Sequence, residues 1–251
     1  MKRHRVLGTG LLTFAALTIT ATPARAVEIS STFSGGIFDG ATTPGFFNYY
    51  VGYSFPSSPS ERRNYFIFDL SAITMPVASA AIKLYLPGPP LLPAGYVSSD
   101  PTEDYRISGS SFPWTAFADA FGGVATPPAL SAMFATMGTG PAYGLTTVSG
   151  DDAGTDIVID LSAAAITDLN AALGGHFLVT GRLTDLHPSM PGMPPSELVF
   201  AYTDLPHPLM PFPRLELTFI PSPGVAALPA VVGITLLTRR RRASRVAGTG
   251  C

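Results

Sequence analysis

Cysteine is nearly absent from this 251-residue sequence, because its single cysteine is the last residue, Cys251. The preceding chain has no cysteine for a disulfide, a cysteine-based metal site or a catalytic thiol, so its fold depends on its core alone. Charged residues make up only 13% of the chain. Soluble domains usually contain about 25%, so the composition argues against a solvating acidic polymer and against a coiled coil.

The few charges are distributed unevenly along the chain. Residues 1–26 contain four bases and no acid, and residues 222–251 contain five bases and no acid. The intervening residues 27–221 hold six bases and all 17 acids, a net charge of −11. An acid excess of this size opposes contact with phosphates, so we expect no nucleic-acid partner.

Residues 1–26 have the three parts of a secretory signal peptide. A basic start precedes an apolar run at 11–19, and Ala24 and Ala26 form a small-x-small cleavage site. The run is shorter than the roughly 20 residues that span a membrane. We therefore expect the Sec-type export machinery and signal peptidase as partners, with cleavage after Ala26.

The C-terminal segment combines a proline motif, an apolar stretch and a basic cluster. Pro221, Ser222 and Pro223 precede an uncharged stretch at 224–237. Four arginines then follow: Arg239, Arg240, Arg241 and Arg242. Such a pattern places the apolar stretch in the bilayer as a transmembrane helix and leaves the arginines in the cytoplasm. A last core helix would be the other interpretation, but four arginines after an unbroken uncharged run are not typical of one.

The arrangement at 221–243 resembles the PEP-CTERM sorting signal of Gram-negative bacteria, which the membrane protease exosortase cuts near a Pro-Glu-Pro motif. Ser222 stands where that family usually has Glu, so the cleavage position stays open, and 244–251 form a further tail. The resemblance implies a transient inner-membrane tether, then delivery to the cell surface or extracellular matrix. It also implies association with exopolysaccharide or biofilm.

The remaining segment, 27–220, is expected to form one β-rich domain. Apolar and polar residues alternate at 64–70, 81–86, 156–161 and 214–219, which is typical of half-buried antiparallel strands with one wet face. Further strands are predicted at 28–34, 47–54, 103–108, 143–149, 176–183 and 197–202. The fold class is therefore all-β, an antiparallel two-sheet, jelly-roll-like β-sandwich.

One short helix is predicted near 162–173. The stretch is rich in alanine, Ser162 can cap its start, and Gly174 follows its end. A second short helix is expected at either 112–121 or 128–136.

The segment 63–86 resembles carbohydrate-binding jelly rolls of the DNRLRE type. Phe68-Asp69-Leu70-Ser71 and then Ala81-Ile82-Lys83-Leu84-Tyr85 follow a pattern that in this family forms two neighbouring core strands. The resemblance implies the fold and assigns no catalytic residue.

Acidic loops offer oxygen ligands for a structural Ca²⁺. Asp151, Asp152 and Asp156 lie between two predicted strands, with a plain polar turn as the alternative. Asp100, Glu103 and Asp104 form a second acidic loop. Neither has the EF-hand pattern.

Aromatic residues crowd the stretch 46–55 and provide candidates for stacking on sugars. A sugar-binding face needs exposed rings together with polar groups. Tyr49, Tyr53 and Trp114 are the candidates, and the alternative is that the rings of 46–55 form strand core.

No catalytic residue is predicted. The sequence has no Gly-x-Ser-x-Gly elbow and no phosphate-binding Gly-rich loop, and its histidines lack metal-ligand spacing. We expect a non-enzymatic exported surface or extracellular-matrix protein with a structural or adhesive role. The alternative is a carbohydrate-binding module or carbohydrate-active enzyme that uses the jelly-roll face.

Overall fold

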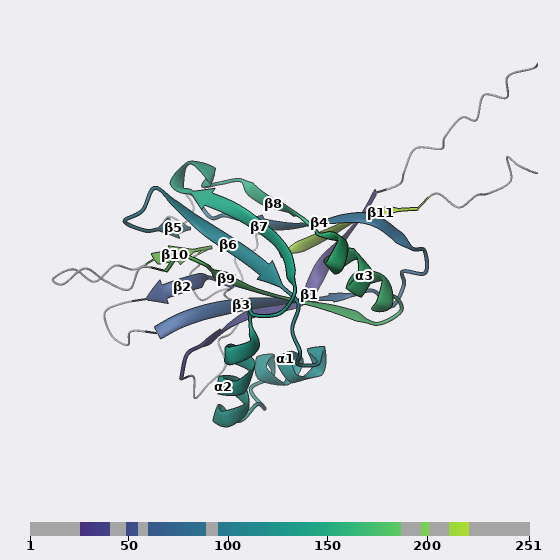
Figure 1. The fold of residues 1–251 in the computed structure, drawn as a ribbon, viewed down its shortest axis with the longest axis horizontal. Helices are drawn as coiled ribbons and strands as arrows, with labels where there is room; N and C mark the ends of the chain where they lie inside the picture. Colours follow the sequence, from purple (N-terminus) through teal and green to yellow (C-terminus); the bar gives the residue numbers. More distant parts are fainter. Residues whose placement is uncertain are drawn as a thin grey trace, which may run out of the picture. The chain divides into compact units, whose positions relative to one another are not determined.

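The computed structural model describes residues 26–40, 49–54, 60–88, 95–186, 197–200 and 211–220. All of them belong to one compact unit, Ala24–Ile220 (Figure 1). Ala24 of the predicted cleavage site and the predicted sorting segment from Pro221 onward lie outside the described residues.

Eleven strands form the unit, and every strand pair within the described ranges is antiparallel. The strands are β1 (Ala26–Phe38), β2 (Val51–Ser54), β3 (Ser60–Asp69), β4 (Val77–Tyr85), β5 (Tyr96–Val97), β6 (Thr102–Ser108), β7 (Ala142–Ser149), β8 (Asp156–Asp160), β9 (His176–Leu183), β10 (Glu197–Val199) and β11 (Arg214–Phe219). The sheets curl into a half-barrel, so the predicted all-β, antiparallel, sandwich-like fold is confirmed.

The long strand β1 connects the two halves of this curl. Its first residues, Ala26–Ser30, pair with β11, and its later residues pair with β3. On one side the order continues from β11 to β4 and β8. On the other side β3 pairs with β2 near its start and with β9 near its end, and β9 leads to β6 and β7. The main core lies inside the curl and receives side chains from both halves.

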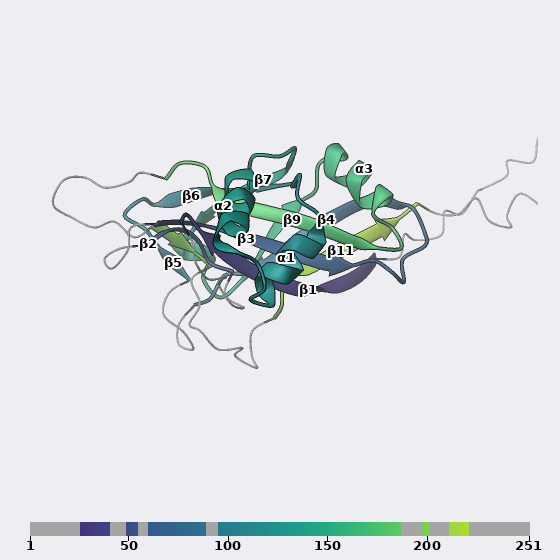
Figure 2. The ribbon, with the colours of Figure 1, turned by 90° about the horizontal axis from the view of Figure 1, so that it is seen from below.

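The predicted alternation is confirmed in β4, β8 and β11, where the apolar set is buried. In β3 the expectation of one wet face is wrong, because Tyr65 and Ile67 are buried as fully as Phe66 and Phe68. Two helices, α1 (Trp114–Phe121) and α2 (Pro127–Thr136), lie over the outer face of β3 and β1 (Figure 2). They create a second apolar core on the outside of the sheet.

The helix content is therefore larger than predicted. The helix α3 (Ala163–Ala171) forms as expected, and Ser162 Oγ accepts a hydrogen bond from Ala165 N at 3.4 Å. The sequence predicted one short helix with a second at one of two places, whereas both α1 and α2 form. Each buries apolar residues in the second core, including Phe117 of α1 and Met133 of α2, and this core also contains Tyr65 and Ile67 of β3.

The strands β3 and β4, which carry the resemblance at 63–86, are not neighbours in the sheet. The order β3-β1-β11-β4 places two strands between them. Their inward side chains nevertheless share one core, in which Phe68 and Leu84 are both fully buried. The expected adjacency is wrong at the level of strand pairing, because the N-terminal and C-terminal strands insert between them.

Candidate functional site

The three aspartates predicted as calcium ligands are not brought together by the fold. Asp152 ends a single 3-10 turn, η1 (Gly150–Asp152), and its Oδ2 accepts hydrogen bonds from Ser149 N at 2.8 Å and Ser149 Oγ at 2.9 Å. Asp156 forms an ion pair with Arg214, and Asp151 is exposed. Two of the three carboxylates therefore serve local structure, which favours the polar-turn alternative for this loop.

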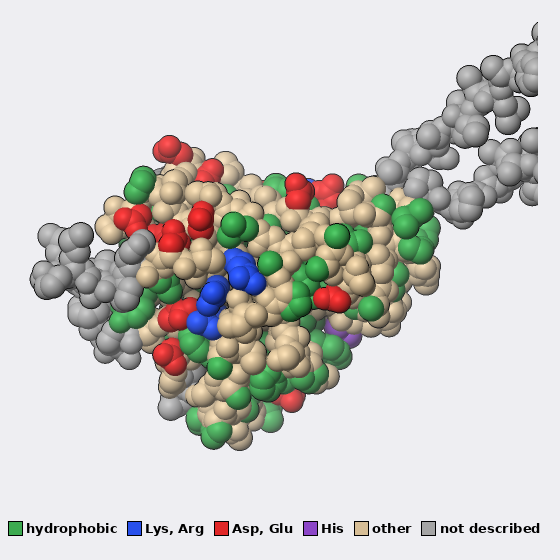
Figure 3. Space-filling view, viewed as in Figure 1, with side chains coloured by type: hydrophobic (Ala, Val, Ile, Leu, Met, Phe, Trp, Pro, Cys, Tyr) green, Lys and Arg blue, Asp and Glu red, His purple; other side chains and the backbone are tan. Residues whose placement is uncertain are grey.

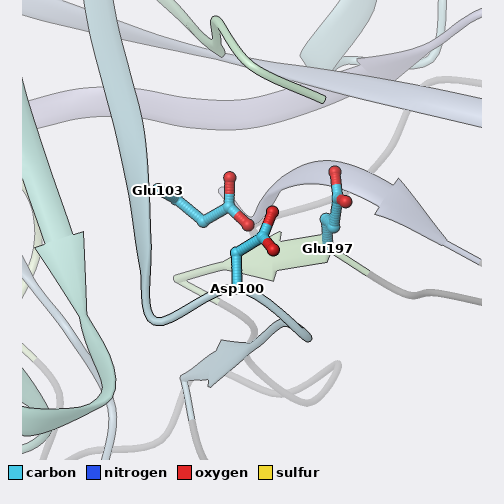
Figure 4. A group of neighbouring side chains, drawn as sticks. All are labelled: Asp100, Glu103 and Glu197. Carbon is cyan, nitrogen blue, oxygen red and sulfur yellow. The ribbon is translucent and has the colours of Figure 1, made fainter. Parts of the chain in front are cut away.

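A different group of carboxylates does converge, formed by Asp100, Glu103 and Glu197 and called here the acidic cluster (Figure 4). One carboxylate oxygen from each residue lies within 4.8 Å of the others. Asp100 lies in the turn between β5 and β6, Glu103 is on β6, and Glu197 opens β10. Two of these residues belong to the second acidic loop of the sequence, but Asp104 faces elsewhere and accepts a 2.7 Å hydrogen bond from Thr147 Oγ1.

Burial dominates the electrostatics of the acidic cluster. Glu103 is 0% exposed and Glu197 is 1% exposed. Ser98 Oγ donates to Glu103 Oε1 at 2.5 Å, whereas Glu103 Oε2 is buried with no hydrogen-bond partner among the described residues. Burial, with smaller contributions from Glu197 and other nearby acids, raises the pKa of Glu103 to about 7.

The three carboxylates of the cluster could hold a divalent cation such as Ca²⁺. Calcium binds carboxylate oxygens at about 2.3–2.6 Å, so two of its ligands lie at most about 5 Å apart. The 4.8 Å span of the three carboxylate oxygens falls within that limit. A divalent cation here would also neutralise charges that burial makes unfavourable, and it would give Glu103 Oε2 a partner.

Glu197 reaches the cluster because a glycine allows close approach of two strands. Glycine 52 of β2 has φ +121, and a Cβ at that position would overlap the carbonyl oxygen of Glu197. Only glycine fits this backbone conformation and this contact. Glu197 was missed from the sequence because it is far from Glu103 along the chain. Its position as an acid at the start of an otherwise apolar strand was the available signal.

The predicted sugar-stacking residues do not form an exposed platform. Tyr49 lies in the core rather than on the surface, with 5% exposure, and its hydroxyl donates to Tyr85 O at 3.1 Å. Tyr53 is half-buried on β2. Trp114 is the first residue of α1. Its side chain is also half-buried and stacks on His176, with ring centroids 3.8 Å apart.

Comparisons with protein-family models and with curated proteins found no match to this chain. Within the described part of the chain, none of the helices is long and apolar enough to cross a membrane. The transmembrane segment expected from the sequence, at 224–237, lies outside the described residues.

Proposed function

We propose that this chain is the precursor of an exported, non-enzymatic protein that a membrane protease of the exosortase type delivers to the cell surface or extracellular matrix. The observation that carries the proposal is the C-terminal order of Pro221-Ser222-Pro223, an uncharged apolar stretch and four consecutive arginines. The N-terminal basic, apolar and small-x-small pattern supplies the matching export signal.

The arrangement of the domain ends supports this route. Ala26 pairs with Thr218 at the junction of β1 and β11, so the chain enters and leaves the folded unit at adjacent points. Cleavage after Ala26 would remove one exposed residue and keep the next pair, Val27 with Leu217. At the other boundary, Ile220 N still donates to Pro76 O at 3.0 Å, so processing beyond Ile220 would leave the fold intact.

The molecular role in this proposal is structural or adhesive, with extracellular polysaccharide as the partner. The strand β10, which carries Glu197 of the acidic cluster, and its neighbour β5 lie at the end of the unit away from the start of β1 and the end of β11 (Figure 1). We also propose Ca²⁺ as the ion of the acidic cluster, supported by its span and by the unpartnered oxygen of Glu103.

Mass spectrometry of the mature protein tests the sorting proposal. We expect an N-terminus at Val27 and a C-terminal peptide that ends near 221–224. A variant with glutamine at Arg239, Arg240, Arg241 and Arg242 should keep the N-terminal cleavage and lose the C-terminal one, because the basic stop that orients the apolar stretch is gone. Recovery of intact 239–251 from wild-type surface protein would contradict the proposal.

A further inference from the structure

Three of the six basic residues in the domain lie in one row across neighbouring strands. Arg106 of β6 is directly opposite Arg182 of β9. In the next pairing, Asn64 of β3 is opposite Gly181, which places the adjacent Arg63 beside Arg182. This arginine row (Arg63, Arg182 and Arg106) coincides with the group of basic side chains that lies over β3, β9 and β6 in Figure 3.

The two outer arginines of the row have structural partners. Arg63 Nη1 donates to Phe134 O at 3.0 Å and Met137 O at 2.9 Å, at the C-terminus of α2. Arg106 donates from Nη2 to Gly140 O at 3.0 Å and from Nε to Ser108 Oγ at 3.1 Å. Both therefore hold the connection between α2 and β7 against the sheet.

The central arginine differs from the outer two at its Nε atom. Arg182 Nε is buried, and no hydrogen-bond acceptor meets it within the described ranges. Burial, together with the charges of Arg63 and Arg106, lowers the pKa of Arg182. Like charges directly opposite each other on paired strands destabilise a sheet. Arg182 is nevertheless held in place, because Gly138 packs on its stem and a Cβ there would lie 2.6 Å from Arg182 Cδ.

One carboxylate of the protein already contacts the row. Glu61 binds Arg63 through both carboxylate oxygens, with Arg63 Nε to Oε1 at 2.6 Å and Nη2 to Oε2 at 3.1 Å. This is the fork-to-fork geometry that makes arginine selective for planar oxyanions. Among the described residues that act electrostatically on Arg182, Glu61 is the one carboxylate that favours its charge, and Glu61 is already paired with Arg63.

We propose that the arginine row is a carboxylate-binding site in which Arg182 receives an acidic group of the ligand, flanked by Arg63 and Arg106. Neighbouring strands are about 4.8 Å apart, so the row spans about 10 Å and suits an extended chain of acidic sugars. The choice of a uronate polysaccharide as the source rests on the proposed matrix function. Carboxylate binding itself follows from the row alone.

Isothermal titration calorimetry of the purified full chain tests this proposal, with trigalacturonate as the probe. A chelator is present so that Ca²⁺ cannot bridge the trisaccharide to carboxylates of the protein. The fully methyl-esterified trisaccharide is the matched neutral probe, and inorganic phosphate is the alternative anion. Of these three probes, we expect only trigalacturonate to bind. The surrounding domain has a net charge of −11, so general attraction of anions does not explain binding.

Variants locate the site. Arg182→Gln should weaken trigalacturonate binding by about tenfold or more, because the charge-assisted fork is lost. Arg214→Gln removes the same charge from another strand and should change affinity by less than about twofold. The thermal midpoint of Arg182→Gln should equal or exceed that of the wild type, since repulsion in the row falls. If that variant does not fold, Arg182→Lys keeps the charge and should still weaken binding.

Three outcomes would overturn the proposal: no binding of trigalacturonate, equal losses in the Arg182 and Arg214 variants, or phosphate binding as tight as that of trigalacturonate. The last would assign the row to phosphate instead. None of these depends on C-terminal processing, so the sorting proposal succeeds or fails separately by mass spectrometry.

Discussion

The hydroxyl of Tyr105 donates a 2.8 Å hydrogen bond to Asn64 Oδ1 inside the core, where both residues are fully buried. Asn64 Nδ2 in turn donates to Tyr49 O at 2.8 Å. Gly181 faces this pair, and a Cβ there would overlap both Tyr105 Oη and Asn64 Oδ1. The polar pair therefore fits in the core only because residue 181 has no side chain.

Replacing this glycine should be costly. We expect Gly181→Ala to lower the free energy of unfolding by about 3 kcal/mol, because it overpacks the core and displaces a buried hydrogen bond. Urea denaturation measures the change. Gly122→Ala is the control, since its Cβ would meet only ordinary contacts beyond 3.4 Å. It should change stability by less than about 0.5 kcal/mol. Similar losses in both variants would argue against the steric explanation.

Glu103 should make stability depend on pH. Burial raises its pKa from 4.5 to about 7, so between these values the folded state binds more protons than the unfolded state. The contribution of Glu103 to the free energy of unfolding is therefore largest below about pH 4.5. It falls by on the order of 3 kcal/mol as the pH rises to about 7. Glu103→Gln should remove the effect.

Thermal unfolding in the presence of a chelator, at about pH 5 and about pH 8, checks this sign. The stability of Glu103→Gln relative to the wild type should increase with pH. Asp151→Asn is the control, because Asp151 is exposed and lies outside the acidic cluster. If the difference in thermal midpoint between the wild type and Glu103→Gln stays constant with pH, the pKa of Glu103 is not raised by folding.

Calcium should raise the melting temperature by binding the folded state. We expect a rise of several degrees in millimolar Ca²⁺, and its loss in Glu197→Gln, which removes one carboxylate charge from the acidic cluster. Asp152→Asn should keep the calcium response, since Asp152 caps the 3-10 turn instead. An unchanged wild-type midpoint, or a response that is lost in Asp152→Asn and kept in Glu197→Gln, would refute the site.

The second core should be necessary for folding of the sheet. Phe117 is fully buried, and its ring centroid lies 5.0 Å from that of Tyr65 on β3. Phe117→Ala should reduce the free energy of unfolding by about 3–5 kcal/mol through the cavity it leaves. Val124→Ala, at a side chain that is 73% exposed, should have little effect. A loss below about 1 kcal/mol for Phe117→Ala would show that α1 covers the sheet only loosely.

Local patterns predicted the elements that need only one buried face. The alternation in β4, β8 and β11 and the Ser162 cap of α3 involve residues close together in the chain, and these elements form as expected. The second buried face of β3 could not be predicted in this way. Tyr65 and Ile67 read as outward residues until α1 and α2, about fifty residues later in the sequence, cover them.

The candidate sites show the same division. The sequence singled out Asp100 and Glu103 as part of an acidic loop, but Glu197 joins them only through the pairing of β10 with β2 and β5. Tyr49 and Trp114 were candidates for exposed rings, with strand core as the alternative for Tyr49. Tyr49 lies in the core, and Trp114 is half-buried and stacks on His176.

The all-β class, the position of α3 and the absence of disulfides follow from the sequence alone, and the two terminal patterns on which the export and sorting proposals rest are also read from it. Each of these depends on composition or on residues within a few positions of one another. The tertiary structure was needed to place β1 and β11 between β3 and β4. It was also needed to bring oxygens of three carboxylates within 4.8 Å of one another and to align three arginines in a row. These features depend on the register between distant strands, which is set by the packing of the whole core.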